Sequence, residues 1–171
     1  MKNIVITGFM GTGKTETGLK LSQKLNCPFL DIDLMVEKME KTKIADIFRE
    51  KGEDYFRRLE TAAIKTALQK EGQVISTGGG ALLKEENRTL LQKAGAFICL
   101  SASPEEIFRR VGSVHGRPLL EGDAPLHKIR TILAERQKIY EQVPYHVKTD
   151  GKSPEEVADE IVDMLKKIEI I

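Results

Sequence analysis

Short apolar runs alternate along this chain with longer stretches in which apolar residues recur every three or four positions. The runs are typical of buried strands, and the periodic stretches are typical of helices packed on a sheet. The predicted strands are 3–7, 27–32, 73–77, 96–100 and 145–148. The predicted helices are 15–25, one around 35–39, a short one from 44 to Gly52, 53–70, 85–93, 104–112, 126–143 and one that begins after Ser153.

Two of these helix starts carry the same sequence signal. Ser103-Pro104-Glu105-Glu106 and Ser153-Pro154-Glu155-Glu156 each place a serine before a proline and a glutamate three positions later. Proline suits the first helical position, and serine with glutamate at this spacing forms a capping box. We therefore expect a reciprocal side-chain cap at both helices.

The order of the elements predicts an α/β fold. Strands that alternate with helices indicate right-handed βαβ units, and hence a three-layer αβα arrangement with a parallel sheet in the middle. The length of 171 residues suits one domain that spans 1–171. Ligands bind beyond the carboxyl ends of strands in such sheets, so the segments after strands one, two and three are expected to share one cleft.

Charge and cysteine content narrow the class of protein. Lys and Arg total 27 and Asp and Glu total 26, so the net charge of +1 offers no field for nucleic acid or membrane. No apolar run is long enough to span a bilayer, and the start of the chain lacks a signal-peptide pattern. Cys27 and Cys99 lie beside apolar runs without metal or redox spacing, which favours buried reduced thiols. We expect a cytoplasmic monomer.

A glycine-rich stretch follows the first predicted strand and opens the first helix. Gly8-Phe9-Met10-Gly11-Thr12-Gly13-Lys14-Thr15 matches G-x-x-x-x-G-K-[ST], the pattern of a phosphate-binding P-loop. The N–H groups of Gly11, Thr12 and Gly13 and of the first helical turn would converge on an anion. Lys14 would reach the β- and γ-phosphates, and the Thr15 hydroxyl would ligate Mg²⁺. The sequence therefore predicts a nucleoside triphosphate site.

Two carboxylates follow the second predicted strand. Asp31 and Asp33 lie two positions apart, which suits either a hydrated Mg²⁺ or a substrate hydroxyl whose proton must be accepted. The alternative is a helix cap, a role that suits one of the two. A kinase that phosphorylates an alcohol needs such a carboxylate.

Three further segments are candidates for binding a small acceptor. Gly78-Gly79-Gly80 exposes backbone that can lie against a polar ligand, or is a plain connection. Arg57 and Glu60 share a helical face, either as a surface ion pair or as an arginine held by Glu60 and aimed at an anionic substrate. Arg136 lies in the predicted helix 126–143 and is ambiguous by itself.

The turn-rich segment 112–124 is predicted to be a mobile lid. Arg117 lies within it, and an arginine on a closing loop can offset charge on a transferring phosphoryl group. The three histidines show no metal spacing and are not expected to be catalytic: His115, His127 and His146. A guanine-specific Asn-Lys-x-Asp string is absent, and strands three and four end at Thr77 and Ser101 without the acidic residue of a motor ATPase.

Together these motifs resemble the shikimate kinase family. The P-loop, Asp31-Ile32-Asp33, Phe56-Arg57-Arg58-Leu59-Glu60, Gly78-Gly79-Gly80, Arg117-Pro118-Leu119-Leu120 and Arg136 occur in the family's order and spacing over Gly8 to Pro154. The resemblance implies ATP-dependent phosphorylation of the 3-hydroxyl of shikimate, towards aromatic amino acids. It also implies a fold of the nucleoside monophosphate kinase type, with a five-stranded parallel sheet in the order 2-3-1-4-5.

The resemblance implies roles for residues on the acceptor side of the cleft. Asp33 would hold the substrate hydroxyls and act as the base. Arg57, Arg136 and the backbone around Gly79 would bind the carboxylate and ring hydroxyls, with Glu60 orienting Arg57.

On the nucleotide side, the resemblance implies that Thr15 ligates Mg²⁺ directly and that Asp31 supports the metal through water. Arg117 would contact the ATP phosphates, so that catalysis falls to Asp33, Lys14 and Arg117. Two further cations, at positions that flank adenine in relatives, are Arg110 and Lys152.

One position departs from the family. Glu16 follows Thr15 where relatives usually carry Ser or Thr, which leaves the backbone N–H of residue 16 for the α-phosphate and places a carboxylate nearby. Two alternatives to shikimate phosphorylation stay open from the residues. One is a kinase of another small hydroxy acid or nucleotide on the same fold, and the other is a nucleotide-binding module without catalysis.

Overall fold

The computed structural model describes residues 1–111 and 124–171, and within them five parallel strands form one sheet. The strands are β1 (Asn3–Gly8), β2 (Phe29–Asp31), β3 (Val74–Ser76), β4 (Gly95–Ser101) and β5 (Tyr145–Lys148). Their order is β2-β3-β1-β4-β5, and every neighbouring pair is parallel. The predicted fold class and strand order are confirmed.

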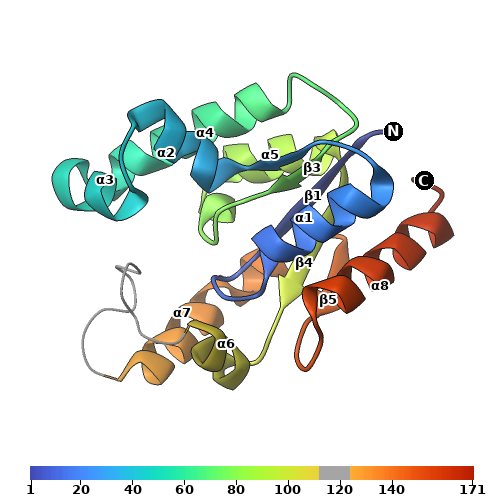
Figure 1. Cartoon of the computed structure of the whole chain (residues 1–171). Helices are drawn as coiled ribbons and strands as arrows, with labels where there is room; N and C mark the ends of the chain where they lie inside the picture. The colour runs from blue at the N-terminus through green and yellow to red at the C-terminus, as the bar shows by residue number, and fades with distance from the viewer. Residues whose placement is uncertain (112–123) are drawn as a thin grey trace.

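Helices cover both faces of the sheet, which produces three layers (Figure 1). On one face, α1 (Lys14–Leu25) packs beside α8 (Pro154–Lys167). The elements that contribute to the core on the other face are α2 (Ile32–Glu40), α3 (Ile44–Lys51), α4 (Glu53–Ala67), the 3₁₀ turn η1 (Ala81–Leu83), α5 (Glu85–Ala94), α6 (Pro104–Val111) and α7 (Pro125–Tyr140).

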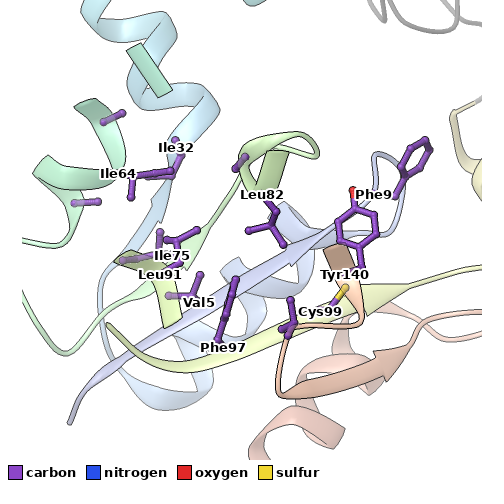
Figure 2. Close-up of a cluster of buried hydrophobic side chains, with 14 of the residues drawn as sticks. Val5, Phe9, Ile32, Ile64, Ile75, Leu82, Leu91, Phe97, Cys99 and Tyr140 are labelled. Carbon is purple, nitrogen blue, oxygen red and sulfur yellow. The ribbon is translucent and has the colours of Figure 1, made fainter. Parts of the chain in front are cut away.

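Alternating side chains of the central strands explain why helices are needed on both faces. Ile4 and Ile6 of β1 pack towards α1 and α8, whereas Val5 packs into the opposite core. Phe97 and Cys99 of β4 lie in the same core as Val5 (Figure 2). Because successive residues of a strand face opposite ways, a wholly apolar strand is stable only when both faces are covered.

The position of β1 determines where a ligand can bind. β1 lies between β3 and β4, so the chain connections leave it towards both edges of the sheet. The crevice at such a reversal of strand order, beyond the carboxyl ends, is the usual ligand site of an open α/β sheet. The glycine-rich stretch that follows β1 opens into this crevice.

The second strand is shorter than the sequence predicted, with a consequence for the acidic pair. The prediction was a strand over 27–32, but Ile32 is already the first residue of α2. Asp31 is the N-cap, because its carboxylate accepts a hydrogen bond from the Leu34 backbone N–H at 3.2 Å. Asp33 therefore lies in the first turn of a helix.

The two predicted capping boxes have different outcomes. The box at residues 153–156 is complete. At α6 the box is only half formed, because the Ser103 hydroxyl accepts from the Glu106 N–H but the Ser103 N–H donates to Asp150 at 2.9 Å. The Glu106 carboxylate is engaged instead by Arg110, at 2.7 Å.

Residues 112–123 lie outside the described residues. They include most of the predicted lid, together with Arg117 and His115. Within the described residues, no helix has the length and apolar character to cross a membrane.

Cys99 is buried, which raises the pKa of its thiol to about 12, whereas Cys27 is only half-buried. The prediction of buried thiols is therefore correct for Cys99 alone. α4 and α7 also end about one turn earlier than predicted, at Ala67 and Tyr140.

Candidate active site

The glycine-rich loop between β1 and α1 needs its glycines for steric reasons. Gly8 has φ +142°, and a Cβ there would collide with the Leu100 carbonyl oxygen. Gly11 has φ +75°, and a Cβ there would come within 2.9 Å of the Val111 side chain. Gly13, with φ +88°, is the left-handed N-cap of α1 and supplies no side-chain cap. The loop therefore presents bare backbone at a positive helix end, which suits an anion.

Two side chains of this loop donate hydrogen bonds to the Phe9 carbonyl oxygen. The Thr12 hydroxyl donates to that oxygen at 2.7 Å. The Lys14 ammonium donates to it at 2.9 Å, so its charge lies at the mouth of the loop. A cation in this position is suited to the terminal phosphates of a nucleotide.

The loop, the acidic pair and the glycine triplet meet in one cavity of about 480 Å³. The prediction that these three segments share a cleft is confirmed. The residues that line it are Met10, Gly11, Gly13, Lys14, Thr15, Glu16, Asp31, Asp33, Thr77, Gly79 and Arg110.

Asp31 combines the two roles that the sequence left open. One carboxylate oxygen caps α2, while the other accepts the Thr15 hydroxyl at 2.7 Å. Hydroxyl and carboxylate oxygens are the donors that Mg²⁺ prefers, and this ion usually takes one or two protein ligands together with water and substrate phosphates. The pair Thr15 and Asp31 therefore fits a nucleotide-bound Mg²⁺.

Asp33 and Glu60 each direct a buried, unpartnered oxygen towards Gly78. No described residue forms a hydrogen bond with Asp33 Oδ1 or Glu60 Oε1. A Cβ on Gly78 would lie 2.6 Å from Asp33 Oδ1 and 2.8 Å from Glu60 Oε1. Only glycine leaves room for both carboxylates here.

Burial changes the acidity of both groups. Burial raises the pKa of Asp33 to about 6, with a further rise from Asp31 that Lys14 and Arg57 oppose. Burial likewise raises the pKa of Glu60 to about 7, against the opposing charge of Arg57. A carboxyl group with a pKa near neutrality is suited to accept a hydroxyl proton and release it again.

Arg57 is held in place by two carboxylates on its own helix. Its guanidinium donates to Glu60 at 2.8 Å and to Glu53 at 3.2 Å. A Cβ on Gly80 would lie 2.8 Å from the central carbon of that guanidinium, so the third glycine lets the arginine rest on the backbone. The predicted contact between Arg57 and Glu60 is present, and its role in substrate binding stays a prediction.

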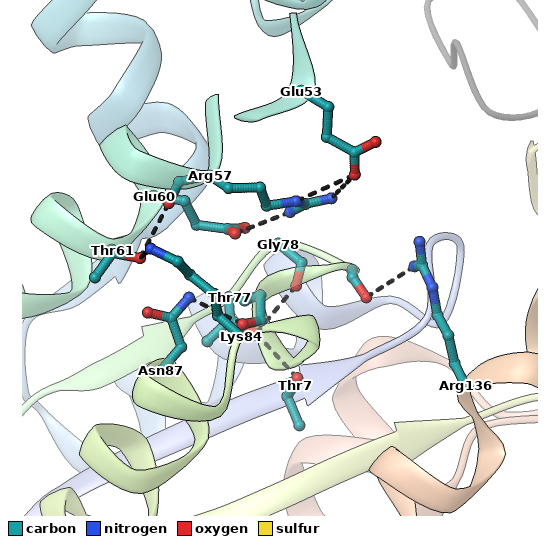
Figure 3. A network of polar contacts seen from close by, with 12 residues as sticks. Thr7, Glu53, Arg57, Glu60, Thr61, Thr77, Gly78, Lys84, Asn87 and Arg136 are labelled. Atoms are coloured by element: carbon teal, nitrogen blue, oxygen red, sulfur yellow. Dashed lines mark hydrogen bonds and ion pairs between the residues drawn. The ribbon is translucent and has the colours of Figure 1, made fainter. Parts of the chain in front are cut away.

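Arg136 reaches the same glycine segment from α7. Figure 3 shows Arg57 and Arg136 approaching the triplet from opposite sides. Arg136 is only 8% exposed, and its guanidinium donates to the Gly79 carbonyl oxygen at 3.2 Å. The guanidinium also lies over the Phe9 ring, 5.7 Å from its centre. This arginine is therefore an ordered cation beside the cleft, not a solvated surface residue.

Tyr140 was missed by the sequence reasoning. Its hydroxyl donates to the same Gly79 carbonyl oxygen at 2.7 Å. The signal in the sequence was the spacing from Arg136, because residues four apart share a helical face.

A second cavity of about 220 Å³ adjoins the loop on the side of α8. Arg110 borders both cavities and is fixed by Glu106 and by the Thr149 hydroxyl at 2.8 Å. Lys152 borders the smaller cavity and donates to Glu160 at 2.5 Å. The structure thus brings together Arg110 and Lys152, the two cations expected near adenine.

Glu16 borders both cavities as well. It lies in the first turn of α1 and is exposed. No ion pair or hydrogen bond joins its carboxylate to another described residue. A carboxylate without a direct partner among the described residues therefore borders both cavities.

A parallel sheet of this order, with a P-loop after its first strand and an acidic pair after its second, defines a P-loop kinase. The family model described as shikimate kinase matches residues 10–166. The chain belongs to the shikimate kinase family and is accordingly a phosphotransferase. The predicted resemblance is confirmed.

Curated relatives agree over nearly the full length. The chain is 46% identical to a shikimate kinase from Thermoanaerobacter pseudethanolicus over 162 residues, with 95% of both chains covered. It is 42% identical to a shikimate kinase from Thermodesulfovibrio yellowstonii, with 98% of this chain and 97% of the relative covered.

Solved structures agree in fold. The structure of shikimate kinase from Acinetobacter baumannii in complex with shikimate superposes with a TM-score of 0.96, at 31% identity and with 100% of this chain and 96% of that chain covered. The enzyme from Aquifex aeolicus gives 0.85 at 40% identity, with 96% of each chain covered. A gluconokinase from Sinorhizobium meliloti, at 20% identity and a TM-score of 0.62, shares the fold alone.

Proposed function

We propose that this chain transfers the γ-phosphoryl group of ATP to the 3-hydroxyl of shikimate, producing shikimate 3-phosphate and ADP on the route to aromatic amino acids. One observation carries the proposal. The Asp33 carboxylate, one oxygen of which is buried, and two hydrogen-bonded arginines, Arg57 and Arg136, surround a bare glycine segment beside a P-loop. This set suits an acceptor with hydroxyl groups and a carboxylate, because guanidinium groups bind carboxylates strongly.

Asp33 is the proposed base on the acceptor side. Its unpartnered Oδ1 can accept the hydrogen of the attacking hydroxyl, and its raised pKa matches that task. Arg57 and Arg136 hold the acceptor's carboxylate, while the Gly79 backbone lies against its ring hydroxyls. Glu60 keeps Arg57 in position. These contacts place the acceptor hydroxyl for in-line attack.

On the nucleotide side, the backbone of Gly11, Thr12 and Gly13 and of the first turn of α1, including residue 16, cradles the phosphates. Lys14 stabilises charge on the transferred group, and Arg117 is proposed to add to this from residues 112–123. Arg110 and Lys152 border the adenosine.

Thr15 and Asp31 would hold Mg²⁺, with Asp31 acting through water. When bound, the ion neutralises phosphate charge and orients the β- and γ-oxygens. The Thr15 hydroxyl donates to Asp31 at 2.7 Å, and both residues line the cavity.

We also propose that residues 1–171 act as one kinase domain, as a cytoplasmic monomer whose partners are its two substrates. The near-zero net charge of +1 supports the absence of nucleic-acid and membrane partners.

The test is ADP release with ATP, Mg²⁺ and a panel of acceptors that contains shikimate, gluconate and nucleoside monophosphates. We expect turnover that depends on shikimate and on no other acceptor. Lys14→Ala should abolish it and serves as the control for contaminating kinases. Absence of shikimate-dependent turnover in the wild type would overturn the proposal.

A further inference from the structure

One backbone carbonyl of the site has two donors from the same helix. The Tyr140 hydroxyl donates to the Gly79 oxygen at 2.7 Å, and the Arg136 guanidinium donates to it at 3.2 Å. Both side chains come from α7, where they are four residues apart and lie on one face. The tyrosine contact is the shorter of the two.

Tyr140 is a buried hydroxyl donor and is not among the residues that line the P-loop cavity. It is 9% exposed, and burial raises the pKa of its hydroxyl to about 12, against the opposing charge of Arg136. It lines a separate cavity between β4, α6 and α7, whereas Gly79 lines the P-loop cavity. Tyr140 thus acts on the acceptor side of the site through its hydrogen bond to Gly79.

Two acceptors compete for the N–H groups of Arg136, the Gly79 carbonyl oxygen and the carboxylate of the proposed substrate. In the structure the guanidinium donates to the Gly79 oxygen at 3.2 Å. Under the proposed function the same guanidinium must grip the carboxylate of the acceptor, and such grips are strongest when two N–H groups take part. A carbonyl oxygen left without a donor in a largely buried site is costly, so the Gly79 oxygen competes with the acceptor for Arg136.

We infer that Tyr140 is a positioning residue for acceptor binding, because it satisfies the Gly79 carbonyl and so releases Arg136 to the substrate carboxylate. The inference rests on the proposed function and assigns a role to a residue that does not line the P-loop cavity. The backbone of Gly79 has little room to shift towards the P-loop. A Cβ at that position would already lie 3.2 Å from the Met10 backbone nitrogen, so the segment is packed against the P-loop.

The test begins with Tyr140→Phe, which removes the hydroxyl and keeps the ring. We expect KM for shikimate to rise about five-fold, as for loss of one hydrogen bond, while KM for ATP stays within about two-fold. The matched control is Tyr55→Phe, which removes a part-buried hydroxyl that donates to Glu40 at 3.1 Å. The control should lower the thermal unfolding midpoint without changing either KM.

The double variant Arg136→Ala with Tyr140→Phe distinguishes a role of Tyr140 in positioning Arg136 from a role in packing alone. In Arg136→Ala no guanidinium is left to compete for, so adding Tyr140→Phe should lower kcat/KM for shikimate by no more than about two-fold. A five-fold loss in both backgrounds would overturn the inference, as would a parallel rise of both KM values with a lowered unfolding midpoint. An unchanged KM for shikimate in Tyr140→Phe would also overturn it. Failure of the proposed function is distinct, because the wild type itself would then show no shikimate turnover.

Discussion

The buried oxygens of Asp33 and Glu60 face one point beside Gly78, at 2.6 and 2.8 Å from where a Cβ would lie. The two carboxylates belong to different helices, α2 and α4, and neither oxygen has a partner among the described residues. The first glycine of the triplet thus determines how closely the proposed base can approach the sheet.

Gly78→Ala is therefore expected to displace Asp33 and lower kcat by about 100-fold, the usual cost of a displacement near 1 Å in an active site. Stability should fall by about 1–3 kcal/mol from overpacking. Steady-state kinetics and urea unfolding would measure both effects. Gly151→Ala is the control, since its φ of +68° imposes strain but nothing lies within 4 Å. Wild-type kcat in Gly78→Ala would contradict the assignment of Asp33.

Asp33→Asn is expected to lower kcat by about 10²–10⁴-fold, because the amide cannot accept a proton. The dissociation constant for ATP should stay within about two-fold, measured by calorimetry. A nucleotide-binding module without catalysis would instead show no turnover in either protein.

The pH profile offers an independent check of the same group. Asp33 must be ionised to act as a base, and its pKa is raised to about 6. We expect log kcat/KM for shikimate to fall with unit slope below about pH 6 and to level off above it. A profile that is flat between pH 5 and 8 would exclude Asp33 as the base.

Arg136→Ala is expected to weaken acceptor binding by about 1.5–3 kcal/mol, the value of a charged hydrogen bond, and to leave KM for ATP unchanged. Arg130→Ala is the matched control on the same helix, because Arg130 is 55% exposed and pairs only with Glu105 among the described residues. Equal effects of the two variants would argue against a specific role for Arg136.

Glu60 links the site to the pH dependence of stability. Its pKa is raised from 4.5 to about 7, so Glu60 binds its proton more tightly in the folded chain than in the unfolded chain. The contribution of this proton to the free energy of unfolding is greatest below about pH 4.5 and is lost as the pH rises through 7. The free energy of unfolding of wild type relative to Glu60→Gln should fall by the order of 3 kcal/mol between pH 4.5 and 8. Parallel pH profiles of the two proteins would contradict this.

Glu16→Gln is expected to tighten binding of ADP by several-fold at low ionic strength, because the Glu16 carboxylate borders the P-loop cavity and repels phosphate. The gain should shrink as salt is added and should be absent for adenosine, which lacks phosphate. Calorimetric titrations would show both. Glu135→Gln, at an exposed position of α7, should leave the affinity for ADP unchanged.

The predictable parts of the site are those that local sequence determines. The P-loop was predictable because strand, glycine loop and helix are contiguous, and the two aspartates because they follow the next strand. Periodicity alone did not provide the strand order, which came from the family resemblance.

The parts that could not be predicted depend on distant backbone. Tyr140 acts on a carbonyl 61 residues away, and Asp150 takes over half of the α6 cap across 47 residues. The spacing of Tyr140 from Arg136 indicates a shared helical face, but no local pattern indicates Gly79 or Asp150 as the partner. The same holds for Glu60, whose pairing with Arg57 follows from helical spacing, whereas its second oxygen meets Gly78 only after folding.

The glycine triplet has a consequence for mutational tolerance. Its three positions face different neighbours: Gly78 meets the two carboxylates, Gly79 meets the P-loop backbone, and Gly80 lies under Arg57. A flexible connection would accept a methyl group at one position by adjusting the other two. Here no position can substitute for another, so a library of random variants should retain glycine independently at all three.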